Sequence, residues 1–333
     1  MPFPPVPPDW ARRRLTHGLA GLAGLAVLPL FPRAACGADT THLLVGYAAG
    51  GGADHIARLV ADSLTTDGVP TIVENRPGAA GQIALHEVAR ATSGPRTLLL
   101  GTVGSVSIGP LLAAAPEPPA TPLQPVAIVA STPHVLLASA GAPAAAQTLQ
   151  ARLAEARRRP GELAYGSLGT HSSAHLVGEL ICQQAGVSMN HVPYPGSARA
   201  LVDLQGGHVA LLVSTLQAAL PLMRQGKVRA LAVTGAARSP LAPGVPTFEE
   251  AGVPGMRQDA WYGVLAAPSM PARACAALAD RFTRLLRTPA LQQRLGQDGA
   301  EPLALTGAQA ADYLARDREV WRQAIGRVAS RLA

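Results

Sequence analysis

A run of three glycines provides the first candidate site of this chain. Residues 48–54 read Ala-Ala-Gly-Gly-Gly-Ala-Asp and lie between an apolar run at 43–47 and a helical pattern that begins near His55. Backbone N–H groups at a helix start have no partner within the helix, and the helix dipole favours negative charge there. Glycine also lets a ligand approach the main chain closely. The sequence therefore predicts an anion-binding loop, and three glycines favour this over a tight turn without a ligand.

The spacing of these glycines can be compared with two nucleotide-binding loops. The phosphate loop G-x-x-x-x-G-K-[ST] needs lysine and a hydroxyl residue where Gly52 and Ala53 stand, so ATP or GTP is not expected. The dinucleotide fingerprint G-x-G-x-x-G needs a third glycine where His55 stands, which disfavours NAD. We expect no cofactor.

The order strand, loop and helix recurs at residues 163–180. An apolar run at 163–167 leads into Leu-Gly-Thr-His-Ser-Ser at 168–173, and a helical pattern follows. Ser172 or Ser173 could cap that helix, while Gly169 and free N–H groups face the open side of the loop. Two such loops on separate domains could hold the two ends of a small acid.

A serine hydrolase is the alternative function suggested by this second loop. Ser167 and Gly169 match half of the nucleophile elbow G-x-S-x-G, but Tyr165 replaces its first glycine. An exported hydrolase would use Ser167 with His175 and Asp203, and no spacing supports that triad. A third class, an adhesive or structural exported domain, would not need the glycine loops.

Two histidines of this segment have the separation of metal ligands on a helix. His171 and His175 are four residues apart, but the zinc motif H-E-x-x-H needs glutamate where Ser172 stands. We expect no metal site. His175 could simply pack on a helix face.

Residues 1–38 have the features of an export signal. Arg12, Arg13 and Arg14 form a basic region, residues 18–31 an apolar stretch too short to span a bilayer comfortably, and residues 34–38 a small-residue cleavage region. The arginines and the leucine that follows them fit a twin-arginine signal, and a Sec signal fits as well. We expect a periplasmic protein.

Charge and size restrict the partners of the exported chain. Cleavage after residue 38 removes four arginines and Asp9, so the formal net charge falls from +7 to +4. Lys227 is the sole lysine, and the scattered arginines have no interleaved aromatics, which argues against nucleic acid. The remaining length suffices for two domains. Cys182 and Cys275 could form a disulfide or remain buried thiols, and the sequence leaves both open.

The chain alternates strand-like and helix-like runs, which is typical of an α/β architecture. Capping boxes are predicted at Thr247 with Glu250 and at Thr306 with Gln309. The second box opens a long helix with one apolar stripe, made of Tyr313, Leu314, Val320, Trp321, Ile325 and Val328. Besides 43–47, strands are predicted at 71–74, 97–101, 126–130, 135–138, 163–167, 190–193, 208–213, 229–233 and 262–266.

Short motifs follow one another along the chain and carry a family resemblance. They are Gly-Gly-Gly-Ala-Asp at 50–54 with Ala-Arg at 57–58, Val-Glu-Asn-Arg-Pro-Gly-Ala at 73–79, Leu-Leu-Leu-Gly-Thr at 98–102, Tyr-Gly-Ser at 165–167, His-Leu at 175–176, Val-Pro-Tyr-Pro-Gly at 192–196, Gly-Gly-His-Val at 206–209, Arg-Ala-Leu-Ala-Val-Thr at 229–234 and Val-Pro-Thr-Phe-Glu-Glu-Ala-Gly at 245–252. In this order they resemble the receptors of tripartite tricarboxylate transporters, the Bug-type extracytoplasmic solute receptors. The resemblance runs from about residue 41 to the C-terminus.

The resemblance implies a two-lobed periplasmic binding protein of the Venus-flytrap kind, type II-like, in which crossover segments join two α/β domains. Lobe 1 would take residues 39–130 and 255–333, and lobe 2 residues 131–254, with hinges near 131–134 and 235–254. The implied function is capture of a small carboxylate (a di- or tricarboxylate, an acidic amino acid or an aromatic acid) for uptake or sensing, without catalysis. The implied partners are this ligand and the membrane subunits of a tripartite tricarboxylate transporter, and the receptor is expected to be a monomer.

The ligand-binding residues expected from the two loops and the resemblance are Ala49, Gly51, Gly52, Asp54, Thr102, Gly169, Thr170, His171, Ser172, Tyr194 and Ser214. Few aromatic residues are available, with Trp261 and Tyr262 as the most plausible neighbours of the pocket, which argues against sugars. His171 stands where the family usually has a small residue, and we hypothesise that it tunes specificity. Asp54, beside an anion-binding loop, could accept from a ligand ammonium or a water, or only cap the helix.

Overall fold

The computed structural model describes residues 40–332, apart from 93–95 and 113–121. The predicted signal peptide, residues 1–38, lies outside the described residues. Within them, no helix combines the length and apolar character that crossing a membrane requires.

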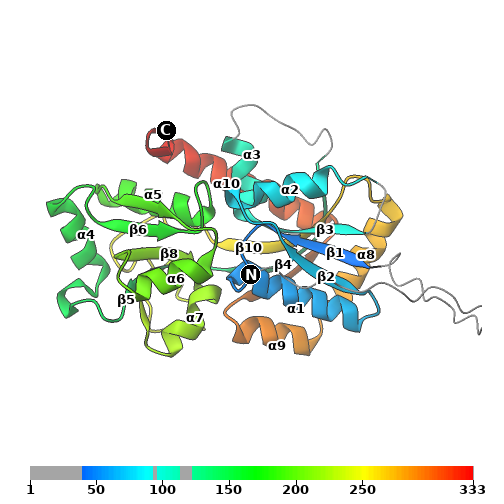
Figure 1. Ribbon diagram of the computed structural model, residues 1–333, viewed down its shortest axis with the longest axis horizontal. Coiled ribbons are helices and arrows are strands. Elements are labelled where there is room, and N and C mark those ends of the chain that lie inside the picture. The colour runs from blue at the N-terminus through cyan, green and yellow to red at the C-terminus, as the bar shows by residue number, and fades with distance from the viewer. Residues whose placement is uncertain (1–39, 93–95, 113–121, 333) are drawn as a thin grey trace, which may run out of the picture. The chain divides into compact units, whose positions relative to one another are not determined.

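Two mixed β-sheets organise the chain (Figure 1). The first sheet has the strand order β11-β4-β10-β3-β1-β2, with β1, β2 and β3 parallel and β4, β10 and β11 joined by antiparallel pairs. The second has the order β7-β6-β8-β5-β9, in which β5 is antiparallel to both of its neighbours. The strands of the first sheet are β1 (Thr41–Val45), β2 (Thr71–Asn75), β3 (Thr97–Thr102), β4 (Gln124–Thr132), β10 (Ala260–Ala266) and β11 (Glu301–Thr306), and those of the second are β5 (His134–Ser139), β6 (Ala164–Ser167), β7 (Asn190–Pro193), β8 (Leu211–Thr215) and β9 (Val228–Val233).

Helices cover both faces of the first sheet, α1, α8 and α9 one face and α2 and α10 the other (Figure 1). Side chains of a strand alternate between the two faces, so Leu43 and Val45 of β1 pack toward α1 while Leu44 packs on the opposite side. The helices are α1 (Gly52–Thr66), α2 (Gln82–Ala89), α3 (Gly109–Leu112), α4 (Leu149–Arg158), α5 (Ser173–Ala185), α6 (Ser197–Gln205), α7 (Leu216–Arg224), α8 (Ala272–Leu285), α9 (Pro289–Gln297) and α10 (Ala308–Leu332), with short 3-10 turns η1 (Ala79–Gly81) and η3 (Ala144–Ala146) and a π-helix η2 (Val103–Ile108).

The chain passes from the first sheet to the second at Pro133, between β4 and β5, and returns through residues 234–259 between β9 and β10. These two crossovers fit the α/β architecture with two lobes that the sequence predicts. The predicted division at residues 130/131 and 254/255 stays a prediction.

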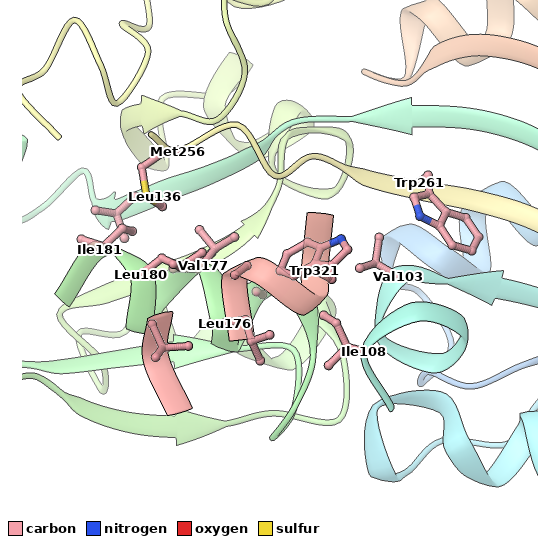
Figure 2. Packing of buried hydrophobic residues seen from close by; sticks show 14 of the residues in the cluster. Val103, Ile108, Leu136, Leu176, Val177, Leu180, Ile181, Met256, Trp261 and Trp321 are labelled. Atoms are coloured by element: carbon pink, nitrogen blue, oxygen red, sulfur yellow. The ribbon is translucent and has the colours of Figure 1, made fainter. Parts of the chain in front are cut away.

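The helix α10 contacts elements of both lobes. It packs on η2 and β4 of the first lobe and on α5 of the second. Figure 2 shows Trp321 of α10 between Leu176 and Val177 of α5 and the π-helix residues Val103 and Ile108. One hydrophobic cluster therefore extends across the two sheets.

Most predicted strands are present, and three differences have local causes. β8 begins at Leu211, three residues later than predicted, because residues 206–210 form a turn with Gly207 at positive φ. β11 was not predicted, because it contains Pro302 and an irregular register. The capping box at Thr306 and Gln309 is wrong, because Thr306 ends β11 and its hydroxyl contacts Thr283.

Three further sequence predictions concern a capping box, an apolar stripe and the cysteines. Thr247 and Glu250 do exchange the two bonds of a capping box. Val320, predicted on the apolar stripe of α10, is instead 46% exposed, whereas Trp321 next to it is fully buried. Cys182 and Cys275 are both free thiols, and burial raises the pKa of Cys182 to about 12.

Candidate ligand-binding site

The first predicted loop connects β1 to α1 as the glycine run requires. Gly51 precedes the helix with extended backbone angles and provides no side-chain cap, so the first N–H groups of α1 depend on partners outside the helix. Gly50 has φ of 79°, a conformation that favours glycine. The N–H of Gly52 donates to Oγ of Ser197, 3.1 Å away on the second lobe.

Asp54 has a structural role in this loop. Its carboxylate accepts from the N–H of Gly50 (2.9 Å), from two nitrogens of Arg58 (2.9 and 3.0 Å) and from Nδ2 of Asn75 (3.0 Å). Burial by itself raises the pKa of Asp54, but these donors outweigh burial and hold the pKa below its usual 3.8. The carboxylate thus stabilises the conformation of the loop through these bonds. A direct contact of Asp54 with ligand stays a prediction.

An Asp54→Asn variant should lower the free energy of unfolding at pH 7 by about 1–3 kcal/mol, because a buried, charge-assisted set of bonds is lost. A carboxylate whose pKa is depressed by folding stabilises the protein above its unfolded pKa, and this contribution disappears as pH falls through the folded pKa. The difference between wild type and variant should therefore shrink below about pH 4. Urea denaturation at several pH values measures it, and a difference that does not depend on pH would contradict this role.

The second predicted loop leads from β6 into α5. Ser172 is the N-cap of α5, and its Oγ accepts from the N–H of His175 at 3.2 Å. Gly169 and His171 have positive φ, 118° and 63°. The N–H of His171 donates to Nδ1 of His175 (3.1 Å), and Thr170 is exposed. The order strand, loop and helix predicted for residues 163–180 is therefore present.

Ser167 does not have the surroundings of a catalytic nucleophile. It is fully buried, and its Oγ lies 2.6 Å from Nε2 of His191, not beside His175. Asp203 pairs with Arg199 at 3.0 Å. The triad of Ser167, His175 and Asp203 is not assembled, so the hydrolase alternative loses its structural basis.

Three histidines lie together behind the second loop. The rings of His175 and His191 are stacked 3.8 Å apart, and His171 lies 6.3 Å from His175. Burial lowers the pKa of His175 to about 3 and that of His191 to about 4, so both are neutral near pH 7. Within the described part of the chain, no group of three His, Cys, Asp or Glu side chains could hold a metal ion.

A small cavity, about 30 Å³, lies where loops of the two sheets meet. Four α-helices begin at this cavity: α1 at Gly52, α5 at Ser173, α6 at Ser197 and α7 after its cap Thr215. None of the lining side chains is charged. The lining residues are Tyr47, Gly51, Gly52, Ala53, Thr102, Val103, Leu168, Ser173, Ser197, Thr215, Ala260, Trp261 and Tyr262.

Three of the predicted ligand-binding residues line this cavity, and the ligand-binding role of every predicted residue stays a prediction. Gly51, Gly52 and Thr102 line the cavity, as do the expected neighbours Trp261 and Tyr262. The other predicted ligand residues do not line it; they are Ala49, Asp54, Gly169, Thr170, His171, Ser172, Tyr194 and Ser214. Ala49, Gly169, Thr170, His171, Ser172 and Tyr194 lie on loops that flank the cavity, and Ser214 is buried at the end of β8 beside Thr215.

Ser173 and Thr215 also line the cavity, at the ends of two segments, 169–173 and 214–215, that the resemblance implies for ligand contact. Two lining residues with hydroxyl groups, Tyr47 and Ser197, were not predicted. Serine at a helix start was the available signal for Ser197, since Gly196 is the N-cap of α6 and Ser197 its first residue. Tyr47 has no such signal.

Hydrogen bonds connect the two lobes around the cavity. The N–H of Ala48 donates to the carbonyl of Pro195 (3.2 Å), and Oγ1 of Thr132 both donates to the carbonyl of Gly299 (3.0 Å) and accepts from the N–H of Gln217 (3.2 Å). A cavity of this size holds about two water molecules.

A larger cavity, about 490 Å³, lies beside α8 at the opposite ends of β1 and β3, and shares no residue with the two loops. Its position at the N-terminal ends of the parallel strands places it away from the helix starts. The glycine loop instead lines two other cavities: the small one, and one of about 460 Å³ that is lined by Gly50, Gly51, Gly52 and Ser197 and also by the charged residues Arg224 and Asp298. Residues of the second loop line only the small one of these two.

Comparison with known proteins agrees with this geometry. The family described as "Tripartite tricarboxylate transporter family receptor" matches residues 56–329. The chain is 31% identical over 293 residues to Protein BugT of Bordetella pertussis, with 87% of this chain and 89% of that protein covered. It is similar to the structure of R. palustris Rpa4515 with adipate (32% identity, TM-score 0.81, 87% of this chain and 97% of that one) and to MatC (Rpa3494) from Rhodopseudomonas palustris with bound malate (29%, 0.79, 86% and 98%).

These similarities define a periplasmic solute-binding receptor and not an enzyme. The chain belongs to the tripartite tricarboxylate transporter receptor family. The family resemblance and the two-lobed α/β fold predicted from the sequence are thereby confirmed.

Proposed function

We propose that this receptor captures a small carboxylate between its two lobes and holds it with neutral donors. The observation that carries the proposal is the convergence of four α-helix starts on one cavity whose lining side chains carry no charge. Each helix start favours negative charge and presents N–H groups without partners in the helix. An anion is the ligand that such a site stabilises.

The donors that line the cavity suit a carboxylate. Hydroxyl groups of Thr102, Ser197 and Thr215 accompany the helix starts, and donors of this kind bind carboxylate oxygens. Adipate and malate, the ligands of two similar structures, are both dicarboxylates. The ligand that we propose is therefore a small di- or monocarboxylate. Both lobes enclose it, and closure of the lobes removes it from water.

The setting of this capture is the periplasm. We propose export by the twin-arginine or Sec signal in residues 1–38, and delivery of the closed receptor, as a monomer, to transporter subunits in the membrane. Binding of the ligand for sensing instead of uptake is the second use compatible with the same site.

Isothermal titration can test the proposal. Protein exported to the periplasm is unfolded, washed free of bound molecules and refolded, and then titrated with malate, succinate and adipate and with the corresponding uncharged diamides. We expect at least one acid to bind and its diamide to bind at least about tenfold more weakly, because the helix starts stabilise charge. Equal binding of acid and diamide, or no binding of any acid, would contradict the proposal.

A further inference from the structure

The buried histidine at the crossover between the lobes contacts the cavity wall. His134 follows Pro133 directly and is fully buried. Its Nδ1 lies 2.8 Å from the carbonyl oxygen of Gln258, on the returning crossover, and its Nε2 lies 2.9 Å from Oγ of Ser173. Ser173 is half-buried and lines the ligand cavity.

The partners of the imidazole determine where its hydrogen lies. A carbonyl oxygen can only accept, so Nδ1 must carry the hydrogen that bonds Gln258. Burial lowers the pKa of His134 to about 4, so near pH 7 the ring is neutral and has one N–H. Nε2 therefore has a lone pair and no hydrogen, and the bond to Ser173 can form only if the serine hydroxyl donates.

This arrangement uses the single hydrogen of Ser173. A hydroxyl has one hydrogen and two lone pairs, so Oγ of Ser173 presents only lone pairs to the cavity. Ser197 has the opposite arrangement: its Oγ accepts from the N–H of Gly52, which leaves its hydrogen available for a ligand oxygen. The cavity thus contains one serine suited to a carboxylate and one suited to a donor.

We propose that Ser173, oriented by His134, selects carboxylates that also carry a hydroxyl or N–H group, and that hydroxy acids are preferred over their deoxy analogues. The inference rests on the proposed capture of a carboxylate and names the ligand class within it. A ligand donor would pair with Oγ of Ser173, whereas a deoxy analogue or a second carboxylate oxygen would leave this lone pair without a partner. An unpaired acceptor in an enclosed site reduces affinity.

Paired titrations test this preference. The refolded receptor is titrated with L- and D-malate against succinate and with L- and D-lactate against propionate. We expect at least one hydroxy acid to bind about tenfold more tightly than its deoxy analogue. Ser173→Ala should reduce this ratio to about twofold or less, and Ser173→Thr, which keeps the hydroxyl, should retain it.

A matched control and a direct observation of the ring complete the test. Ser188→Ala removes an exposed serine of the same lobe and should change neither affinity nor ratio. Long-range proton–nitrogen NMR correlations of the histidine rings should show His134 with hydrogen on Nδ1 only, which needs no ligand and no variant.

The outcomes separate the two proposals. Binding of acids with equal affinity for hydroxy and deoxy members would overturn the selection by Ser173 and leave the carboxylate receptor standing. A hydrogen on Nε2 of His134 would also overturn the selection. Binding of no acid would overturn the carboxylate receptor, and the selection with it.

Discussion

Replacing Trp321 by alanine should lower the free energy of unfolding by about 3–5 kcal/mol, the usual effect of removing a large buried aromatic side chain. Trp321 is fully buried in α10, among residues of α5 and of the π-helix η2 (Figure 2). The expected loss has two parts. The burial of the apolar indole surface is lost, and the surrounding side chains of the two lobes do not fully close the cavity that remains.

The matched control is the next residue. Val320 is 46% exposed, and Val320→Ala should change the free energy of unfolding by less than about 0.5 kcal/mol. Urea denaturation of ligand-free protein, followed by tryptophan fluorescence and circular dichroism, measures both variants. A loss below about 1.5 kcal/mol for Trp321→Ala would mean that α10 does not hold the two lobes together.

The contacts of α10 with both lobes predict a single unfolding transition. Upstream of Trp321, Asp317 accepts from Oγ of Ser107 (2.5 Å) and from Nε1 of Trp261 (2.9 Å), which connects α10 to the cavity wall. At its end, Arg331 donates to the carbonyl of Val187 (3.1 Å) in the second lobe. Because one helix contributes to both lobes, unfolding should follow a single transition, whereas independent lobes would give two.

Much of the fold was predictable because its signals are local. Apolar runs ending in glycine-rich loops predicted β1 and β6 and the helices after them. β11 escaped because proline and a positive φ at Ala304 obscure its strand pattern. The contribution of α10 to the second lobe also escaped, since periodicity identifies an apolar face but not the surface that it packs on.

The candidate site was also predictable only where its residues lie within one loop. Gly51 and Gly52 were found from a single loop, whereas the cavity combines ends of segments far apart in the sequence, such as Tyr47 and Ser197. Their proximity depends on the arrangement of two sheets, which no spacing along the chain encodes. Asp54 illustrates a related difficulty: its position beside the loop was evident, but its partners Arg58 and Asn75 required the structure.

The charge of the ligand can be tested by placing a charge where the ligand is expected. Oγ of Ser197 accepts from the N–H of Gly52 at the start of α1, so the carboxylate introduced by Ser197→Asp would occupy the place of a ligand carboxylate. The added charge also lies at the start of α6, where acidic residues stabilise a helix, so the fold should be retained. We expect an unchanged or higher melting temperature together with the loss of acid binding.

The magnitude follows from repulsion between the new carboxylate and the ligand. Two unit charges about 5 Å apart repel by roughly 3 kcal/mol at an effective dielectric constant of about 20, which corresponds to about a hundredfold in Kd. Ser197→Asn has nearly the same size without the charge, so the ratio of Kd between the two variants isolates the electrostatic effect. Titration with the acid that binds the wild-type receptor measures this ratio. Equal affinities of the aspartate and asparagine variants would show that the ligand carboxylate does not lie at the start of α1. The carboxylate would then be assigned to another of the four helix starts.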